Sequence, residues 1–294
     1  MNRTGLNCAL STPFLATGAV DIPRLVNHAR WVLDQGANGV TLFGTTGEGA
    51  SIGIGERYAM MGAMAGAGFN LPDRVIAGVS AASETECLAQ CRAAYEMDCR
   101  GLLLAPPFYF SGVTDDALFR FFAALFEKLG GALRDVLLYH IPGMTRVPIS
   151  IELTRRLADA FPGVIAGVKD SAGDWAMTAR RLAELSDMQV LIGDERQLAR
   201  AVAIGGAGSI CGLANVAPDL LLPLANEGKD DLRVHRMVDA ILQFPFMPAV
   251  KALISERLGD PGWRIMRAPL DALSADEARG LAKALADIRL AQAA

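Results

Sequence analysis

The sequence has little of what marks a membrane-bound or exported protein. No apolar run reaches the roughly 18 residues of a membrane span before glycine, proline or a charged residue interrupts it. Residues 1–5 contain no long apolar stretch of the kind that forms a secretory signal. These absences argue against contact with a membrane, and we expect a cytoplasmic protein.

Residues that bind metals are scarce as well. The chain holds five cysteines, an odd number without regular spacing, and three dispersed histidines. A disulfide framework is therefore not expected, and we predict reduced thiols. Cys87 and Cys91 share one predicted helix and Cys99 follows it, but no histidine is near them. We expect small buried thiols there and no metal site.

Positive charge is also limited. The net charge is −4 and the isoelectric point is near 5.5, and the arginines are scattered along helical segments. Without a basic stripe, nucleic acid is not expected as a partner. With 294 residues, 52% of them hydrophobic and 20% charged, the chain can bury a large core. That size fits either two ordinary domains or one α/β barrel with an appendage.

Short apolar runs alternate with longer segments of helical period along most of the chain. This alternation is typical of a parallel sheet with crossover helices. The predicted strands are residues 6–10, 39–43, 75–79, 101–105, 136–139, 164–169, 189–192 and 208–211. The predicted helices are residues 22–36, 54–68, 83–97, 114–129, 150–160, 174–186 and 195–204, with another from Pro218. Ser83 and Glu86 are expected to form a capping box.

Eight such units in residues 1–225 predict an α/β fold of the (β/α)8 TIM barrel type. A doubly wound sheet, the alternative, usually has fewer strands and a switch point. Residues 226–294 continue with helical pattern and a break at 259–262 that is rich in proline and glycine. We predict a catalytic barrel over 1–225 and a C-terminal helical subdomain over 226–294.

Lys169 stands out among the five lysines because it ends the apolar run 163–168. The other four lysines lie in segments of helical or loop character. At a strand end Lys169 is expected to be half-buried, and burial favours the uncharged amine, which can attack a ketone to form a Schiff base. Taken alone, a lysine that snorkels to the surface from a strand edge explains the position at least as well.

The active site of such a barrel lies at the carboxyl ends of the strands, and two further strand ends carry suitable groups. The second strand leads into residues 44–49, which read Gly-Thr-Thr-Gly-Glu-Gly. Gly44 and Gly47 bring backbone N–H groups close to a ligand, and two threonine hydroxyls can bind a carboxylate. The segment matches neither a phosphate loop nor a dinucleotide turn, and a simple tight turn is the alternative.

Tyr139 ends the fifth predicted strand. If its ring points into the barrel, the neighbouring His140 points away, and Pro142 then starts a turn. The alternative is a core aromatic residue with its hydroxyl at the rim. A carboxylate pocket, a phenol and a buried amine together suit a 2-keto acid held as an imine.

Three motifs of the sequence together resemble those of a known family. The motifs at 44–48, 139–142 and 167–174, in this order and spacing, resemble the dihydrodipicolinate synthase / N-acetylneuraminate lyase family of Schiff-base barrel enzymes. The resemblance extends over almost the whole chain and includes the segments 106–109 and 208–215.

The resemblance implies a role for each matching residue. Lys169 forms the imine with pyruvate or a pyruvyl unit, and Tyr139 relays protons. Thr46 helps to hold the keto-acid carboxylate, and Thr45 links to Tyr139. Tyr109 matches a tyrosine that reaches into the neighbouring subunit's site in many members. Further substrate-binding positions are expected at Gly44, Gly47, Gly193, Ile210, Ser171 and Met144.

Met144 is the one departure from the family pattern. Synthases of the lysine pathway carry an arginine there, which binds the carboxylate of aspartate semialdehyde. A thioether cannot replace the charge-assisted hydrogen bonds of a guanidinium. Arg146 is two residues further on, and in an extended segment that shift is roughly 6–7 Å. Dihydrodipicolinate synthesis is therefore disfavoured.

The leading hypothesis is a lyase that acts on pyruvate or a 2-keto-3-deoxy sugar acid through the imine at Lys169. The alternatives are a dihydrodipicolinate synthase, a keto-acid dehydratase and a barrel that binds keto acids without turnover. The resemblance implies no cofactor besides the covalent imine. It also implies a homotetramer, built as a dimer of dimers.

Overall fold

Eight short strands pair in parallel in chain order, and the last strand pairs with the first, which closes the sheet into a barrel. We analysed a computed structural model that describes residues 3–291. The strands are β1 (Gly5–Ala9), β2 (Gly39–Leu42), β3 (Val75–Val79), β4 (Gly101–Leu104), β5 (Val136–His140), β6 (Ile165–Asp170), β7 (Gln189–Ile192) and β8 (Gly208–Cys211). The predicted barrel is confirmed.

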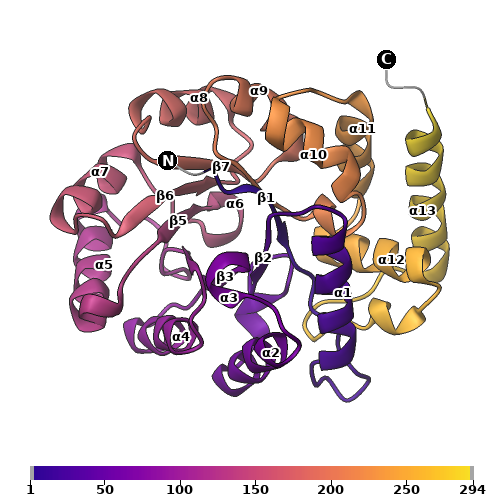
Figure 1. Cartoon of the computed structure of the whole chain (residues 1–294), viewed down its shortest axis with the longest axis horizontal. Helices are drawn as coiled ribbons and strands as arrows, with labels where there is room; N and C mark the ends of the chain where they lie inside the picture. The colour runs from indigo at the N-terminus through magenta and orange to yellow at the C-terminus, as the bar shows by residue number, and fades with distance from the viewer. Residues whose placement is uncertain (1–2, 292–294) are drawn as a thin grey trace.

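Helices surround the barrel, and the last ones extend along one side of it (Figure 1). They are α1 (Ile22–Asp34), α2 (Ile54–Gly66), α3 (Leu71–Arg74), α4 (Glu84–Glu96), α5 (Asp115–Leu129), α6 (Pro142–Thr145), α7 (Ile151–Ala160), α8 (Trp175–Glu184), α9 (Leu198–Ala203), α10 (Pro218–Glu227), α11 (Leu232–Ile241), α12 (Phe246–Leu258) and α13 (Ala275–Leu290).

The division into two parts stays a prediction. Its boundary, between residues 225 and 226, falls in the last turn of α10. The predicted ranges also include residues 1–2 and 292–294, which lie outside the described part of the chain. The helices α11, α12 and α13 follow the barrel and pack on one another.

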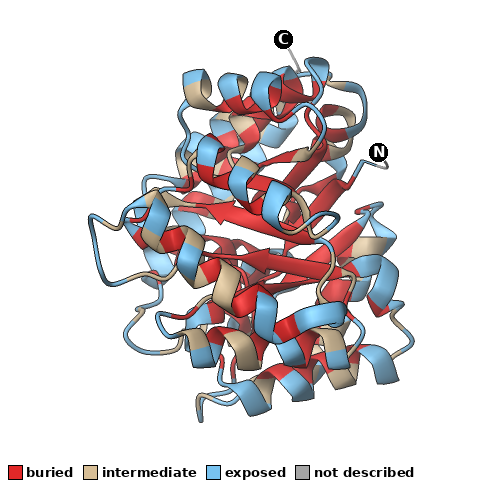
Figure 2. Cartoon of the chain, turned by 90° about the vertical axis from the view of Figure 1, so that its left-hand side faces the viewer, coloured by how far each residue is buried: buried red, intermediate tan, exposed pale blue. Residues whose placement is uncertain are grey.

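The strands separate two apolar cores. Residues that point into the barrel form a small cluster that includes Ile76, Leu103, Leu137, Tyr139 and Ile210. Residues of the opposite parity pack against the inner faces of the helices in a much larger cluster. Figure 2 shows the strands buried almost throughout, while the helices are buried on one side and exposed on the other. Burial on both faces explains why the strands read as continuous apolar runs.

Helix starts follow the sequence closely, with one difference. The Thr114 hydroxyl accepts a hydrogen bond from the N–H of Ala117, and Ser83 accepts one from the N–H of Glu86. The expected capping box at Ser83 forms only in this half, because the Glu86 carboxylate instead accepts from Gln90, 3.1 Å away. Glu86 and Gln90 are four residues apart, so they face each other one turn along the helix.

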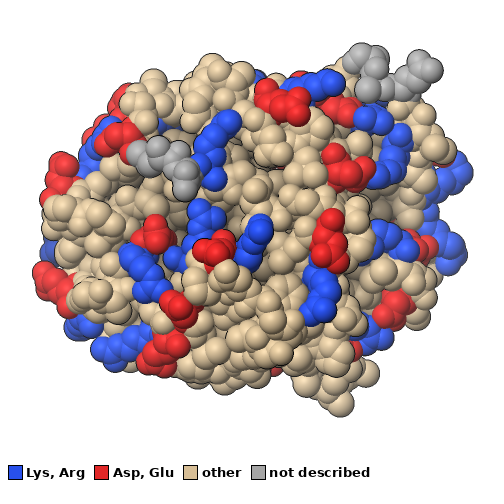
Figure 3. All heavy atoms as spheres, viewed as in Figure 1, with Lys and Arg blue, Asp and Glu red and all other residues tan. Residues whose placement is uncertain are grey.

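The described part of the chain has no single helix that is long and apolar enough to cross a membrane. Only α11 and α12 taken together reach that length and composition, and the chain bends by 113° between them. On the face shown in Figure 3, basic and acidic side chains are intermingled. All eight residues from Pro248 to Ser255 in α12 are buried in the protein.

The Asn215 side chain links the end of β1 to the residue after β8, where the barrel closes. Its amide donates to the carbonyls of Ala9 and Gly212, both at 2.8 Å. Its Oδ1 accepts from the N–H of Ser11 and lies 3.0 Å from Nε2 of His28. Burial lowers the pKa of His28 to about 4, so the imidazole is neutral and Nε2–H is the donor. All four hydrogen-bonding positions of the Asn215 side chain are therefore occupied.

We predict that Asn215→Ala lowers the free energy of unfolding by at least about 3 kcal/mol, because it leaves several buried groups without partners. Urea unfolding followed by circular dichroism measures the change. Asn70→Ala is the matched control: Asn70 is exposed and its side chain donates to Asp73 three residues on, so its effect is expected within about 0.5 kcal/mol. Equal effects of the two variants would contradict the role of Asn215 in closure.

Candidate active site

A short polar chain lies inside the barrel at the carboxyl ends of β5 and β6. Lys169 and Tyr139 are register partners on these strands, so both side chains point inward. Nζ of Lys169 donates to the hydroxyl of Tyr139 at 3.1 Å and lies 4.3 Å from the centre of its ring. Lys169 is 4% exposed, so the expectation of half-burial was wrong: the closed barrel covers the side chain on all sides.

Thr45 continues this chain. Its hydroxyl lies 3.3 Å from the hydroxyl of Tyr139, so Lys169, Tyr139 and Thr45 form a connected series of polar groups. These three residues come from three different strand ends, and a series of this kind can pass a proton from one end to the other. The structure thus brings together three of the four predicted catalytic residues.

The loop after β2 is a tight turn that leaves a few groups free. The N–H groups of Gly47 and Gly49 both donate to the carbonyl of Gly44, so the N–H of Gly47 is not available to a ligand as expected. Within residues 3–291, the N–H groups of Thr45 and Thr46 and the hydroxyl of Thr46 have no hydrogen-bond partner. Thr46 is 6% exposed, and these three donors suit a carboxylate.

Two buried cations hold this loop. Lys251 of α12 donates to the Glu48 carboxylate at 2.6 Å and to the carbonyl of Ile265 at 2.8 Å. The side chains of the pair are 0% and 1% exposed, and burial lowers the pKa of Lys251 while Glu48 opposes the shift. On the other side, Arg57 of α2 donates to the carbonyls of Ile52, Gly78 and Gly49.

Asp170 and His140, which directly follow Lys169 and Tyr139 on their strands, point out of the barrel, because successive residues of a strand face opposite sides. Asp170 accepts from Thr178 and lies 3.2 Å from Nε of Arg181, with both side chains buried. His140 also points away from the barrel centre, as expected, and accepts from the N–H of Ile149. Burial, and then the charge of Arg181, lowers the pKa of His140 to about 4.

Ser171 and Gly193 lie together beyond β6 and β7. A Cβ at residue 193 would come within 1.9 Å of the Ser171 hydroxyl, so only glycine fits there. Ile210 lies in the inner cluster with Tyr139. These three predicted substrate-binding residues therefore surround the strand ends, and none of them borders the cavity described next.

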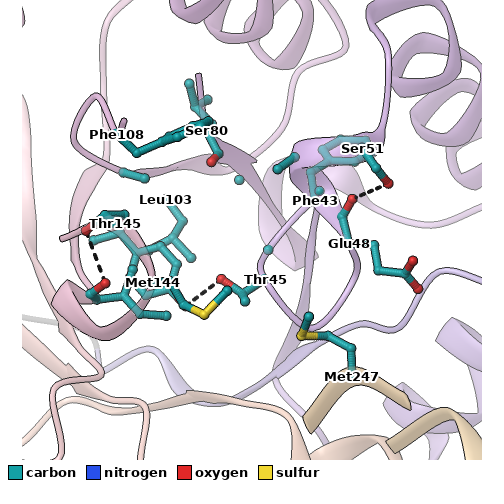
Figure 4. Close-up of a pocket in the computed structure, with 18 of the residues that line it drawn as sticks. Phe43, Thr45, Glu48, Ser51, Ser80, Leu103, Phe108, Met144, Thr145 and Met247 are labelled. Atoms are coloured by element: carbon teal, nitrogen blue, oxygen red, sulfur yellow. Dashed lines mark hydrogen bonds between the residues drawn. The ribbon is translucent and has the colours of Figure 1, made fainter. Parts of the chain in front are cut away.

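A cavity of about 370 Å³ opens above this polar chain (Figure 4). In the view of Figure 4, Phe108 and Ser80 lie above it and Thr45, Met144 and Met247 lie below. Four predicted residues border the cavity: Gly44, Thr45, Tyr139 and Met144. Lys169 reaches it through the hydroxyl of Tyr139. Tyr109 does not contribute within its own chain, because it is 86% exposed.

The segment after Tyr139 differs from the extended chain that we expected. Residues Pro142–Thr145 form one helical turn, α6, and Arg146 ends it with φ at 59°. Met144 is 58% exposed and borders the cavity, whereas Arg146 points elsewhere and is not among the lining residues. Arg146 therefore does not compensate for the thioether at residue 144.

Sequence reasoning missed several residues of the site. Ser80 follows β3, and the rule about strand ends was enough to find it. Met247, Arg267 and Leu270 also line the cavity, but they come from the C-terminal helical part. No local sequence pattern indicates that this part of the chain returns to the barrel mouth.

The fold and the site together define the class of protein. A (β/α)8 barrel with a lysine amine buried at its carboxyl end, bonded to a tyrosine hydroxyl, is the arrangement of a lyase of the class I aldolase type. This protein is such an enzyme.

Comparison with known proteins adds the family. Residues 2–288 match the Dihydrodipicolinate synthetase family, and the chain belongs to it. A DapA-like lyase from Chloroflexus aurantiacus is 32% identical over 94% of each chain. The 4-hydroxy-tetrahydrodipicolinate synthase 1 of Streptomyces coelicolor is 33% identical over 90% of this chain and 83% of its own.

Solved structures agree with this placement. A dihydrodipicolinate synthase from Agrobacterium tumefaciens superposes with a TM-score of 0.95 at 45% identity, over 97% of this chain and 99% of that one. A 2-keto-3-deoxygluconate aldolase from Sulfolobus has a TM-score of 0.85 at 22% identity, over 97% and 96% of the two chains. The second likeness shows a shared fold.

We predict that Lys251→Met destabilises the protein by about 3–5 kcal/mol, because it leaves the Glu48 carboxylate buried without a cation. Chemical denaturation measures the loss. Lys283→Met is the control, since that lysine is exposed on α13 and pairs with the exposed Asp287 one turn further along the helix. The double variant Lys251→Met/Glu48→Gln is expected to recover part of the stability. An unchanged unfolding midpoint for Lys251→Met would contradict this account.

Proposed function

We propose that the protein forms an imine between Lys169 and the keto carbon of pyruvate, and makes or breaks the carbon–carbon bond next to it. The hydrogen bond of 3.1 Å from the Lys169 amine to the Tyr139 hydroxyl carries this proposal. It joins a buried nucleophile to a proton carrier at the barrel mouth. Membership of the family supports the same chemistry.

Each of four site residues has its own role in forming the imine. The N–H groups of Thr45 and Thr46 and the Thr46 hydroxyl bind the pyruvate carboxylate. The uncharged amine of Lys169 attacks the keto carbon, and the adduct loses water to form the imine. Tyr139 delivers the proton that the leaving oxygen needs, and Thr45 connects it to the barrel mouth.

The imine then serves as the electron sink. The Tyr139 oxygen, which gave its proton to the leaving water, takes a proton from the methyl group of the bound pyruvate and leaves an enamine, whose carbon attacks an aldehyde. The aldehyde oxygen takes that proton from Tyr139, and water hydrolyses the iminium, releases the product from Lys169 and returns a proton to Tyr139. In the cleavage direction the same steps run in reverse. Because the iminium nitrogen accepts the electrons, we expect the reaction to need no cofactor.

We also propose that Tyr109 works in a second copy of the chain. Tyr109 and Phe110 are 86% and 67% exposed, and their rings pack edge to face at 5.3 Å. Tyr109 has φ at 88°, which is costly for a bulky residue and is retained where a neighbour uses it. An exposed aromatic tip supports insertion into a partner, within a homotetramer built from two tight dimers.

We also propose that the protein is cytoplasmic. All five cysteines are buried and unpaired. Free thiols are typical of proteins in a reducing compartment.

Dihydrodipicolinate synthesis is the second candidate function, and the name of the Agrobacterium relative, 45% identical, favours it. That reaction needs a cation for the carboxylate of aspartate semialdehyde, in addition to the groups that bind the pyruvate carboxylate. Met144 stands at the expected position, and Arg146 does not reach the cavity. We therefore place this reaction behind an aldol reaction with another acceptor.

We predict that borohydride and pyruvate together add one reduced pyruvyl group to the peptide that contains Lys169. Mass spectrometry of the digested protein locates the label. Tyr139→Phe should still fold and bind pyruvate but lose about 10²–10⁴-fold in turnover, because it removes the proton carrier. Label on another lysine, or no label on active protein, would refute the imine at Lys169.

A mixing experiment tests the shared site. Tyr109→Phe and Lys169→Ala are each expected to have low activity. In a mixed dimer, one site combines the intact lysine of one chain with the intact tyrosine of the other. Refolding the two variants together should restore activity well above either alone. If the mixture stays as inactive as its components, Tyr109 does not act across the interface.

A further inference from the structure

The cavity above Lys169 offers very little to a polar acceptor. Seven side chains with polar atoms border it: Thr45, Glu48, Ser51, Ser80, Tyr139, Thr145 and Arg267. Six of them are already hydrogen-bonded within the protein, Thr45 and Tyr139 to each other. Among the described residues of this lining, only the Ser80 hydroxyl has no side-chain partner. A sugar chain with several hydroxyls would leave most of them unpaired.

Among the residues that the structure describes, Arg267 is the only cation in this lining, and its charge is already paired. Its guanidinium makes a two-pronged contact with the Glu56 carboxylate, at 2.7 and 3.0 Å, and also donates to the carbonyls of Ser51 and Gly18. Its Cζ lies 4.4 Å from the centre of the Phe14 ring. Capture of an acceptor carboxylate would have to break this arrangement.

The remaining lining is hydrocarbon and thioether. Phe43, Phe108, Met144, Met247 and Leu270 border the cavity together with smaller apolar residues. Figure 4 shows the two methionines on the side of Thr45 and the Phe108 ring across from them. Thioether sulfur and aromatic edges make favourable contacts with a flat ring, and flexible methionines adapt to its outline.

We propose that the acceptor is an aromatic aldehyde that carries no carboxylate and no polyol chain. This inference rests on the proposed function, because it needs the enamine of pyruvate at Lys169. The ring lies against Met144, Met247 and Phe108, while the aldehyde oxygen faces the Tyr139 hydroxyl. A volume of about 370 Å³ is at the lower end of the range typical for small-ligand sites, about 300–1,000 Å³.

The reaction balances without an oxidant or reductant. The enamine carbon of pyruvate bonds to the aldehyde carbon, and the electrons of the carbonyl double bond move to oxygen. Tyr139 gives its proton to that oxygen. Water hydrolyses the iminium and releases a 4-aryl-4-hydroxy-2-keto acid, and the reverse reaction cleaves the same compound.

The experiment compares kcat/KM for pyruvate with three acceptors: benzaldehyde, glyceraldehyde and aspartate semialdehyde. Benzaldehyde is expected to exceed both others by about ten- to a hundredfold, the discrimination typical of an apolar pocket. A higher value for glyceraldehyde or for aspartate semialdehyde overturns the inference.

Variants locate the preference in the cavity. Met247→Gln is expected to lower kcat/KM for benzaldehyde severalfold, because it puts an amide against the ring. Met177→Gln is the control, since Met177 is half-buried on α8 and does not border the cavity. Met144→Arg should shift the preference towards aspartate semialdehyde. Unchanged preference in both cavity variants overturns the inference.

Borohydride trapping with pyruvate alone separates the two proposals, because it needs no acceptor. Trapping at Lys169 without a preference for benzaldehyde leaves the proposed function intact and overturns the acceptor class. Absence of trapping overturns the proposed function and the acceptor class with it.

Discussion

Each strand of this barrel is buried on both faces, and this constraint decides where every side chain of β5 and β6 goes. Successive residues of a strand point to opposite faces, so Lys169 faces inward and Asp170 faces the helices. A shift of one residue would put the carboxylate inside and the amine among apolar helix residues. The register of Tyr139 with Lys169 is therefore inseparable from the closure of the barrel.

A polar group inside such a core needs a partner, and the arrangement of partners shapes the site. The amine of Lys169 donates a hydrogen bond to the Tyr139 hydroxyl, and that hydroxyl is hydrogen-bonded to the hydroxyl of Thr45. Outside the strands, Asp170 is held by Thr178 and faces Arg181. One face of the strand end thus carries reactive groups and the other carries groups that fix its position.

The C-terminal helices take part in the same site. Lys251 reaches from α12 to Glu48, and Arg267 reaches from the following segment to Glu56 at the start of α2. Both contacts hold the chain that follows β2, which carries the two threonines. The same contacts pair Glu48 and Arg267, the charged residues of the cavity lining, with Lys251 and Glu56. Their charges are therefore not available to a polar acceptor, and the contacts that hold the loop also make the cavity apolar.

Local pattern was sufficient for the barrel. The number and order of the strands follow from the alternation of short apolar runs and amphipathic helices, and Lys169, Tyr139 and Thr45 were found because strand ends can be read from those runs. The tertiary structure decided what these patterns do not record: the full burial of Lys169, the helical turn at Met144, and the return of Lys251 and Arg267 to the loop after β2. The contacts of Lys251 and Arg267 join residues some 200 positions apart, such as Glu48 and Lys251, and no periodicity within a strand or helix records them.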